Sequence, residues 1–101
     1  MKPLPAASLH LVLALLEGGE NHGYALLKRV EELSDGSVKM GPGTLYGTLN
    51  RLLDDGLIEE TTAPGEERRR SYRLTAHGED VARSELRRLR SLVARLKSAP
   101  A

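Results

Sequence analysis

The pattern of apolar and polar positions predicts a chain built mainly from helices. Apolar side chains cover nearly the whole circumference of residues 6–17, so a helix here would be buried on several sides. Gly18 and Gly19 end this helix. A second helix is expected from about residue 23 to residue 33, because apolar residues form one stripe there and charged residues face the other way. The first third of the chain is therefore expected to form a pair of helices joined by a short glycine turn.

A third helix follows, and its two sides differ in chemistry. Gly41 can cap it, Pro42 suits its first position and Gly56 ends it. One side is lined with leucines: Leu45, Leu49, Leu52 and Leu53. The opposite side carries small and polar residues: Gly43, Thr44, Gly47, Asn50, Arg51 and Asp54. Such a helix would bury its first side and present the second to a partner.

The next segment predicts two strands and a turn. Residues 57–62 and 68–74 have the pattern of short strands, and a turn is expected at residues 63–66, which contain a Pro-Gly pair. A two-stranded hairpin is marginal alone, so it must lean on the helices. Thr75 is a good N-cap for a last helix that runs to about residue 97. The predicted fold class is therefore mainly α with a small β-hairpin.

The order helix, helix, helix, hairpin, helix is that of a winged helix-turn-helix followed by one extra helix. In a winged helix the second helix of the helix-turn-helix lies in the DNA major groove, and the hairpin, or wing, contacts the backbone or the minor groove. We therefore expect residues 1–74 to form a winged helix-turn-helix DNA-binding domain. Residues 75–101 are expected to form a C-terminal dimerisation helix.

The chemistry of the third helix supports this prediction. The formal net charge is only +1, so the local distribution of charge has to indicate the partner. Between Val38 and Leu53 there are two basic residues, Lys39 and Arg51, and no acidic ones. Asn50 and Arg51 have side chains suited to adenine and guanine, respectively, and the start of the helix suits a phosphate. The candidate DNA contacts in this segment are Lys39, Gly43, Thr44, Gly47, Asn50 and Arg51.

Four arginines fall in the second predicted strand, where a wing would contact phosphates: Arg68, Arg69, Arg70 and Arg73. An alternative is that they offset acidic residues across the hairpin, since cross-strand pairs of opposite charge stabilise hairpins. The acidic residues concerned are Glu59, Glu60, Glu66 and Glu67. The arginines alone do not separate these interpretations. Together with the acid-free helix and the order of elements they favour DNA binding, and Arg68, Arg69 and Arg70 are taken as candidate contacts.

Three segments occur together at the spacing of a known family: His22-Gly23-Tyr24, Lys39-Met40-Gly41-Pro42-Gly43-Thr44-Leu45-Tyr46 and Arg70-Ser71-Tyr72-Arg73-Leu74-Thr75. Over about residues 8–80 the chain resembles the PadR family of bacterial winged-helix transcriptional regulators. The resemblance implies a homodimeric repressor on operator DNA, with the first and last helices in the dimer interface. Gly47 stands where the family often has Pro, and Leu53 where it often has Glu. Both lie in the third helix, so the operator sequence does not carry over.

The three tyrosines divide between two expected roles. By the same resemblance, Tyr24, Thr44 and Tyr46 match positions that the family places near the DNA backbone, and a tyrosine hydroxyl is a suitable donor to phosphate. Each ring could instead pack against the junction of helices and wing. Packing is the favoured interpretation for Tyr72, because strand alternation puts it on the same side as Leu74. For Tyr46 both roles are compatible, with the ring buried and the hydroxyl outward.

The last helix carries apolar residues at alternating intervals of four and three, which is a heptad seam. The seam residues are Ala82, Leu86, Leu89, Val93 and Leu96. A helix beyond the wing has little of the DNA-binding domain to pack on, so a partner helix is expected; the alternative is packing against the first helix of the same chain. The first helix, which the resemblance also places in the interface, offers Leu9, Val12 and Leu16. A two-fold dimer would set its recognition helices roughly 34 Å apart on a pseudo-palindromic site.

Composition narrows the classes of function. The chain has no Cys, which excludes disulfides, thiolate zinc sites and cysteine nucleophiles. His10, His22 and His77 lack the spacing of a metal site, and no nucleophile–base pattern is present. We therefore expect no catalytic residue, no metal, no cofactor and no enzyme activity. The longest apolar stretch is far too short for a membrane span, and the lack of Cys fits a reducing cytoplasm. The family resemblance implies a cytoplasmic bacterial protein that joins the nucleoid when bound to DNA.

Two alternatives remain beside a DNA-binding regulator. A winged helix can serve protein–protein contact without DNA binding, with its arginines meeting an acidic partner. A regulator can also respond to a small hydrophobic effector held in the dimer interface. The chain has 19 Leu but no Phe or Trp, and its three Tyr lie outside the two helices expected in the dimer. An effector site in that interface would therefore be aliphatic.

Overall fold

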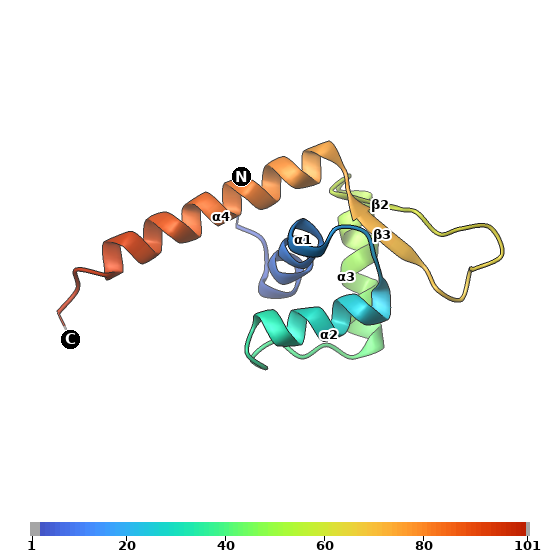
Figure 1. Ribbon diagram of the computed structural model, residues 1–101, viewed down its shortest axis with the longest axis horizontal. Helices are drawn as coiled ribbons and strands as arrows, with labels where there is room; N and C mark the ends of the chain where they lie inside the picture. The colour runs from blue at the N-terminus through green and yellow to red at the C-terminus, as the bar shows by residue number, and fades with distance from the viewer. Residues whose placement is uncertain (1–2, 101) are drawn as a thin grey trace.

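The computed structural model describes residues 3–100. Within this range the chain forms four helices and a three-stranded antiparallel sheet, arranged as in Figure 1. The helices are α1 (Ala6–Gly18), α2 (Gly23–Leu33), α3 (Pro42–Asp54) and α4 (Ala76–Leu96). The strands are β1 (Asn21–His22), β2 (Ile58–Glu60) and β3 (Ser71–Leu74). The predicted fold, a winged helix-turn-helix with a small β element and one further helix, is confirmed.

The ends of the helices lie close to the predicted positions. Gly41 precedes α3 in an extended conformation, and Pro42 is the first residue of the helix. Gly56 follows α3 with a φ of +73°, in the left-handed region where glycine has no steric penalty. The Thr75 side chain caps α4 by accepting a hydrogen bond of 3.0 Å from the Gly78 N–H. Local capping chemistry therefore positions both α3 and α4.

The sheet has three strands within the described residues, where two were expected. β1 pairs antiparallel with β3, and β3 also pairs with β2, so the order is β1-β3-β2. The Gly23 N–H continues this link by donating a hydrogen bond of 3.1 Å to the Arg70 carbonyl. A two-residue strand has no alternation of its own, and it forms here because β3 offers an open edge. β1 thereby ties the helix-turn-helix to the base of the wing.

Both wing strands are shorter than predicted, because the chain between them turns twice. Residues 61–70 form a wing loop, although residues 57–62 and 68–74 were expected to be strands. The expected turn at residues 63–66 is closed by a 3.0 Å backbone hydrogen bond, and a 2.8 Å bond from the Arg69 N–H closes a second turn. These turns use backbone groups that a longer ladder would need. Three arginines therefore lie in the wing loop and not in a strand: Arg68, Arg69 and Arg70.

The expected alternation along β3 is also interrupted. Strict alternation would put Ser71 on the exposed side with Arg73, but Ser71 and Tyr72 are both buried. The reason is β1, which covers this side of the strand: the Ser71 hydroxyl lies 2.7 Å from Nδ1 of His22. Tyr72 packs in the core, as predicted.

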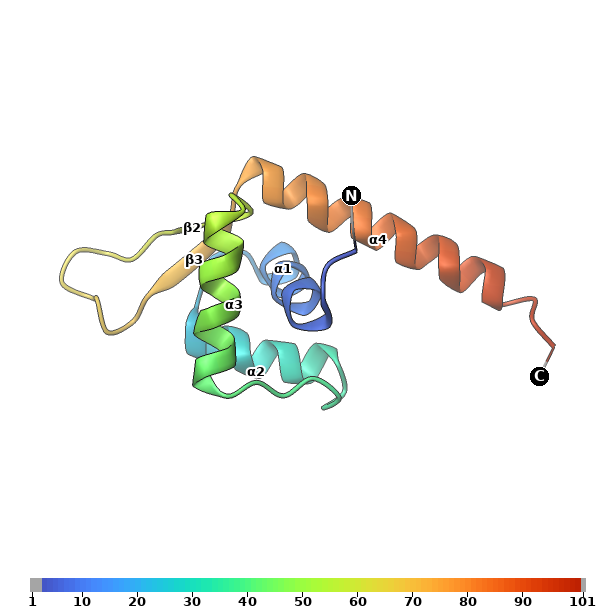
Figure 2. The ribbon, with the colours of Figure 1, turned by 180° about the vertical axis from the view of Figure 1, so that it is seen from behind.

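The core surrounds α1, which packs against α2, α3, α4 and β3. Figure 2 views α1 along its axis with the other helices around it. Its buried apolar residues are Leu11, Val12, Ala14 and Leu15, as the nearly all-round apolar pattern predicted. By contrast, α4 contributes Val81 and Ala82 to the core only near its start. Its second half extends away from the body of the molecule (Figure 1). The whole molecule, with α4 included, measures 56 Å along its longest axis.

The start of α4 lies against the segment between α3 and β2. The Thr75 hydroxyl donates a hydrogen bond of 2.6 Å to the Gly56 carbonyl, and the Thr75 N–H donates one of 3.1 Å to the Leu57 carbonyl. At Gly78 the approach is so close that a Cβ would lie 1.8 Å from the Leu57 carbonyl oxygen, so only glycine fits. This contact fixes the direction in which α4 leaves the body.

Candidate nucleic-acid interface

The fold separates the two sides of α3 as their chemistry predicts. Leu45, Leu49 and Leu52 are buried in the core. The small and polar residues of the opposite side are exposed: Gly43, Thr44, Gly47, Asn50 and Arg51. The first acidic residue on this side is Asp54, the last residue of the helix. α3 therefore presents an acid-free surface along almost its whole length.

The start of α3 is open to an external acceptor. Its N-cap, Gly41, has no side chain to accept from the first turn, and the first backbone bond is the 3.0 Å contact from the Leu45 N–H to the Gly41 carbonyl. The earlier N–H groups of the helix have no intrahelical partner. Together with the partial positive charge of a helix N-terminus, these groups suit an anion such as phosphate.

Tyr46 joins α3 to the first residue of α2. A Cβ built on Gly23 would lie 3.1 Å from the Tyr46 hydroxyl oxygen and 3.4 Å from its Cε1 atom, so the end of the ring packs directly on the glycine. Tyr46 is 38% exposed. Its hydroxyl lies beside the start of α2, although the sequence suggested that the hydroxyl turns outward. The contact helps to set the angle between the two helices of the helix-turn-helix.

Tyr24 and Lys28 form an exposed patch on the first turns of α2. Tyr24 is 66% exposed, and the Lys28 amino group is 5.3 Å from the centre of its ring, in cation–π contact. Lys28 was not among the residues predicted from the sequence, although its position four residues after Tyr24 on a helix was an available signal. Lys39, in the loop before α3, is exposed and has its amino group 3.9 Å from the Glu31 carboxylate.

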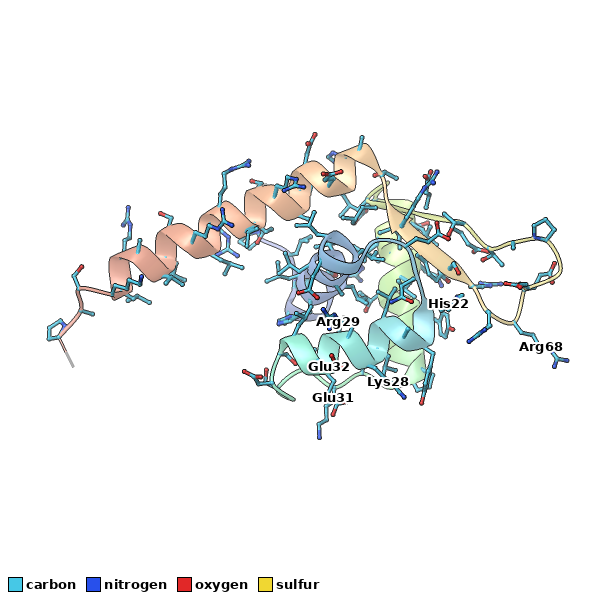
Figure 3. All side chains as sticks on the ribbon, in the orientation of Figure 1. His22, Lys28, Arg29, Glu31, Glu32 and Arg68 are labelled. Carbon is cyan, nitrogen blue, oxygen red and sulfur yellow. The ribbon has the colours of Figure 1, made fainter. Side chains whose placement is uncertain are left out.

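The arginines of the wing differ in whether they form an ion pair with a carboxylate. Among the described residues, Arg68, Arg69 and Arg70 form no ion pair. The Arg68 side chain projects from the wing loop into solvent in Figure 3. Arg73 is paired, with its Nε atom 2.5 Å from Oε1 of Glu59, and this carboxylate raises the pKa of the guanidinium. The cross-strand interpretation therefore applies to Arg73, while the arginines of the wing loop keep free charge.

Arg70 is more constrained than the two arginines before it. Its carbonyl accepts the hydrogen bond from Gly23, and its guanidinium lies close enough to the Tyr72 hydroxyl to lower the pKa of that group. Burial and the nearby Glu60 carboxylate oppose this effect, and the pKa of Tyr72 is raised overall. Arg70 thus belongs to the base of the wing.

Two residues expected in the dimer interface lie inside the protomer instead. Val12 and Ala82 are both 0% exposed, because α1 and the start of α4 pack against each other. The prediction of a partner contact is wrong for these two residues. The alternative, in which α4 packs against the first helix of its own chain, holds for the first turns of α4. Heptad spacing could not separate the two cases, since an apolar stripe has the same spacing whether its own chain or another covers it.

The rest of the seam lies where α4 has left the body. Leu86 and Leu89 are half-buried, whereas Val93 and Leu96 are 56% and 61% exposed. A shallow hollow follows the seam and is lined mainly by apolar atoms of Leu86, Leu89, Arg90, Val93, Ala94 and Lys97. The second half of α4 therefore carries an apolar stripe that its own chain leaves uncovered.

A second apolar hollow, of about 350 Å³, lies where α1, α2 and α4 meet. It is lined by His10, Leu13, Leu16, Glu17, Leu33 and Leu86. Leu9 and Leu16 of α1, which were expected in the dimer interface, are half-buried. We call this feature the α1/α2 hollow below.

The described residues hold no candidate for a metal-binding cluster or for a membrane-spanning helix. Within residues 3–100 no group of three or more His, Cys, Asp or Glu side chains could hold a metal ion. No helix in this range is long and apolar enough to cross a membrane. Two histidines have local partners: Nδ1 of His10 is 2.7 Å from the Ala6 carbonyl oxygen, and His22 contacts Ser71.

Comparison with known proteins provides relatives of known class. Residues 12–84 match the sequence pattern of the transcriptional regulator PadR-like family. The chain is 38% identical over 89 residues to the transcriptional regulator Rv3488 of Mycobacterium tuberculosis, and the alignment covers 86% of this chain and 78% of Rv3488. Two other curated relatives are longer, and the chain spans 24% and 23% of their lengths.

Solved structures share the fold. A PadR family transcription regulator from Clostridium difficile matches with a TM-score of 0.73 and 24% identity, over 92% of this chain and 96% of that one. FabT of Streptococcus pneumoniae, solved in complex with DNA, matches with a TM-score of 0.75 and 20% identity, over 99% of this chain and 64% of FabT. These structures support the fold, and the sequence matches show the family. The chain belongs to the PadR-like family of transcriptional regulators, which are DNA-binding proteins and not enzymes.

Proposed function

We propose that the protein binds double-stranded operator DNA as a homodimer and represses transcription from the promoter that it covers. The observation that carries this proposal is the exposed, acid-free side of α3, which lies beside a wing loop whose arginines form no ion pair within residues 3–100. In a winged helix, α3 would enter the major groove while the wing loop follows the backbone. Repression follows from occupancy, because a dimer on a promoter competes with RNA polymerase for the same DNA.

The residues of α3 divide between close approach and base recognition. At Gly43 and Gly47 a Cβ would meet nothing within 4 Å, so the protomer does not require glycine there for packing. Their lack of side chains lets the helix backbone come near base edges. Asn50 can pair with adenine, and Arg51 can donate two hydrogen bonds to guanine. Base recognition is therefore assigned to the middle of the helix.

Contacts with the DNA backbone would come from two places: the residues around the start of α3 and the wing loop. Around its start, the candidates are Tyr24, Lys39, Thr44 and Tyr46, with Lys28 beside them. The wing loop adds Arg68, Arg69 and Arg70. Phosphate contacts of this kind fix the register of a protein on the duplex, and they make its affinity depend on salt.

A second copy of the chain is the proposed partner of α4, with residues 1–74 as the DNA-binding domain and residues 75–101 as the dimerisation helix. Beyond residue 86, α4 and its C-cap carry five basic residues and no acidic ones: Arg87, Arg88, Arg90, Arg95 and Lys97. Glu17 lines the α1/α2 hollow, and its ion-pair partner within the protomer is Arg29. Across a two-fold axis, the apolar stripe of α4 would meet the apolar lining of this hollow.

The proposed dimer sets the form of the operator. The seam of one copy would cover the α1/α2 hollow of the other, so the exposed leucines of α4 and the half-buried leucines of α1 become buried together. Two-fold symmetry would then place the two α3 helices roughly 34 Å apart, in successive major grooves on one side of the duplex. A pseudo-palindromic operator is the expected target.

A mobility-shift assay tests the proposal. Duplex fragments from the region upstream of the protein's own gene are titrated with purified protein at several salt concentrations. We expect tight binding to a pseudo-palindromic fragment that weakens steeply as salt rises. No shift with any upstream fragment at low salt would contradict the proposal and favour a winged helix used for protein–protein contact.

The α1/α2 hollow favours a second candidate role, the sensing of a small hydrophobic effector. Its volume of about 350 Å³ and its leucine lining suit an aliphatic molecule. A molecule seated there would compete with the α4 seam of the second copy and release the operator. A panel of aliphatic compounds tests this role. Compounds that raise the melting temperature of the protein should also release it from DNA. If no compound in the panel does both, the role is contradicted.

A further inference from the structure

A hollow separate from the dimer surfaces lies between the start of α1 and the outer side of α3. Its volume is about 320 Å³, and it is lined by Pro5, Ala7, Ser8, Thr44, Gly47, Thr48 and Arg51. Figure 2 shows α1 and α3 next to each other, with α3 toward the viewer. The hollow shares three residues with the proposed DNA-binding side of α3, and Ser8, Ala7 and Pro5 add a part of the chain that sequence analysis did not associate with DNA. We call it the α1/α3 hollow.

The start of α1 leaves backbone donors without partners. Its N-cap is Pro5, which has no side-chain acceptor, and the first backbone hydrogen bond is that of 2.8 Å from the Leu9 N–H to the Pro5 carbonyl. The N–H groups of Ala6, Ala7 and Ser8 precede that bond. At α4, by contrast, the Thr75 hydroxyl satisfies one such group. α1 is thus open to an acceptor from outside the protomer.

Ser8 is an independent sign of a ligand. The residue is only 4% exposed and lines the hollow, and its hydroxyl makes no hydrogen bond to any described residue. Because the rest of the residue is buried, this hydroxyl can reach a partner only through the hollow. A hydroxyl on the wall of a polar hollow at a helix N-terminus is positioned to donate to an anion.

The opposite wall supplies the charge. Arg51 is exposed and forms no ion pair among the described residues, and the neighbouring Thr44 hydroxyl also lacks an intramolecular partner there. No acidic side chain lines the hollow. The α1/α3 hollow therefore offers a guanidinium, hydroxyl groups and free backbone N–H groups, which is the donor set that binds a phosphate.

We propose that the α1/α3 hollow binds one phosphate group, and that this group is a backbone phosphodiester of the operator at the edge of the groove that α3 enters. The inference rests on the proposed DNA-binding function, because the hollow and the outer side of α3 share Thr44, Gly47 and Arg51. It adds Ser8 and the start of α1 to the interface. It also reassigns Arg51 from guanine recognition to phosphate binding, which leaves Asn50 as the residue that recognises a base.

A scan of the DNA backbone tests the assignment of Ser8. Each phosphate of an operator half-site is replaced in turn by a neutral methylphosphonate, and the dissociation constant is measured by fluorescence anisotropy. The unmodified protein should lose about 10-fold in affinity at one position in the half-site. Ser8→Ala should bind unmodified DNA about 5- to 10-fold more weakly, and should lose clearly less than the parent at that one position.

Ser84→Ala is the matched control, because Ser84 is exposed on α4 and does not line the hollow. It should behave as the parent protein at every phosphate. If Ser8→Ala binds as tightly as the parent and shows the same losses at all positions, the inference is overturned while DNA binding by α3 stands. If the parent binds no duplex at all, the proposed function fails, and the assignment to a DNA phosphodiester fails with it.

Arg51 gives a separate readout. Arg51→Ala should weaken binding about equally for operators that differ at each base pair, because a phosphate contact carries no sequence information. Asn50→Ala should change the preference at one base pair. A changed base preference in Arg51→Ala would return this residue to base recognition and overturn its place in the phosphate site.

Amide resonances distinguish DNA from a free anion without any variant. Signals of Ala6, Ala7 and Ser8 are followed by NMR while the protein is titrated with operator duplex or with inorganic phosphate, at constant ionic strength. Saturable shifts with the duplex and none with inorganic phosphate support the phosphodiester. Saturable shifts with phosphate alone would overturn the assignment to DNA in favour of a free anion, and no shift with either would overturn the site.

Discussion

The body of the protein and the second half of α4 use the same residue types with opposite outcomes. The leucines and valines of the body's helices are mostly buried, whereas Leu92, Val93 and Leu96 are 47%, 56% and 61% exposed. Charges follow the same division. Arg29, Arg73 and Arg83 are paired with glutamates, but beyond Arg88 no basic residue of α4 has a carboxylate partner among the described residues. The exposed apolar and basic surface of the second half of α4 therefore indicates a covering partner, but the surface alone does not identify that partner.

The side of the body proposed to face DNA differs from the rest of the body. There the arginines of the wing loop and Arg51 have no ion-pair partner in the part of the chain that the structure describes, although acidic residues are plentiful elsewhere in the body. Among the described residues, arginines without an ion-pair partner therefore gather on the exposed side of α3 with the wing and on the exposed half of α4. These are the two surfaces assigned to DNA and to a second copy.

The largest effect is expected from breaking the joint between the two regions. Gly78→Ala would force a methyl group toward the Leu57 carbonyl oxygen, 1.8 Å from the ideal Cβ position, so α4 would have to move off the body. The free energy of unfolding should fall by about 3 kcal/mol or more, as measured by urea denaturation. Gly43→Ala is the control, since a Cβ there meets nothing within 4 Å. Equal stability of Gly78→Ala and the parent would show that this contact does not hold α4.

The next effect separates the two copies. Leu89→Asp would place a carboxylate in the seam, where a partner would bury it without a compensating group. Light scattering after size exclusion should then give a monomer, and affinity for a palindromic operator should fall about 100-fold because the second half-site is no longer linked to the first. Ser91→Asp adds the same charge at an exposed position two residues away and should remain a dimer. A dimeric Leu89→Asp protein would refute the proposed interface.

The smallest effect compares free with paired arginines in the wing. Replacing both Arg68 and Arg69 by Ala should weaken operator binding about 10-fold and reduce the slope of affinity against salt by about two units, one for each lost phosphate contact. Arg73→Ala should change both quantities little, because Glu59 already holds this side chain. The measurement is anisotropy over a range of salt concentrations. Equal slopes for the double variant and the parent would rule out wing contact.

The sequence predicted the parts of the fold that local chemistry determines. The helix boundaries followed from Gly41, Pro42, Gly56 and Thr75, because caps act on their own helix. β1 was not predictable from its own residues, since two residues have no period and the strand exists only because β3 lies beside it. The short wing strands depend on turn hydrogen bonds that strand propensity does not reveal.

The candidate site shows the same limit. The outer side of α3 could be predicted from one helical wheel, and each residue predicted there is exposed. The burial of Val12 and Ala82 inside the protomer could not be predicted, because a heptad pattern does not reveal which helix covers the apolar stripe. Ser8 was not identified, because its buried position and its distance from α3 in the sequence hide a proximity that only the packing of α1 against α3 creates.

The attachment of β1 and Gly23 to the wing has a consequence for the kinetics of recognition. Because the base of the wing is hydrogen-bonded to the helix-turn-helix before DNA arrives, the entropic cost of ordering falls mainly on residues 63–69, which are held by turn hydrogen bonds of their own. Rigid elements that meet DNA already in place lose little conformational freedom on binding. Association should then be limited by diffusion and by the attraction between the wing arginines and the duplex, and the lifetime of the complex should depend on how well α3 matches the bases.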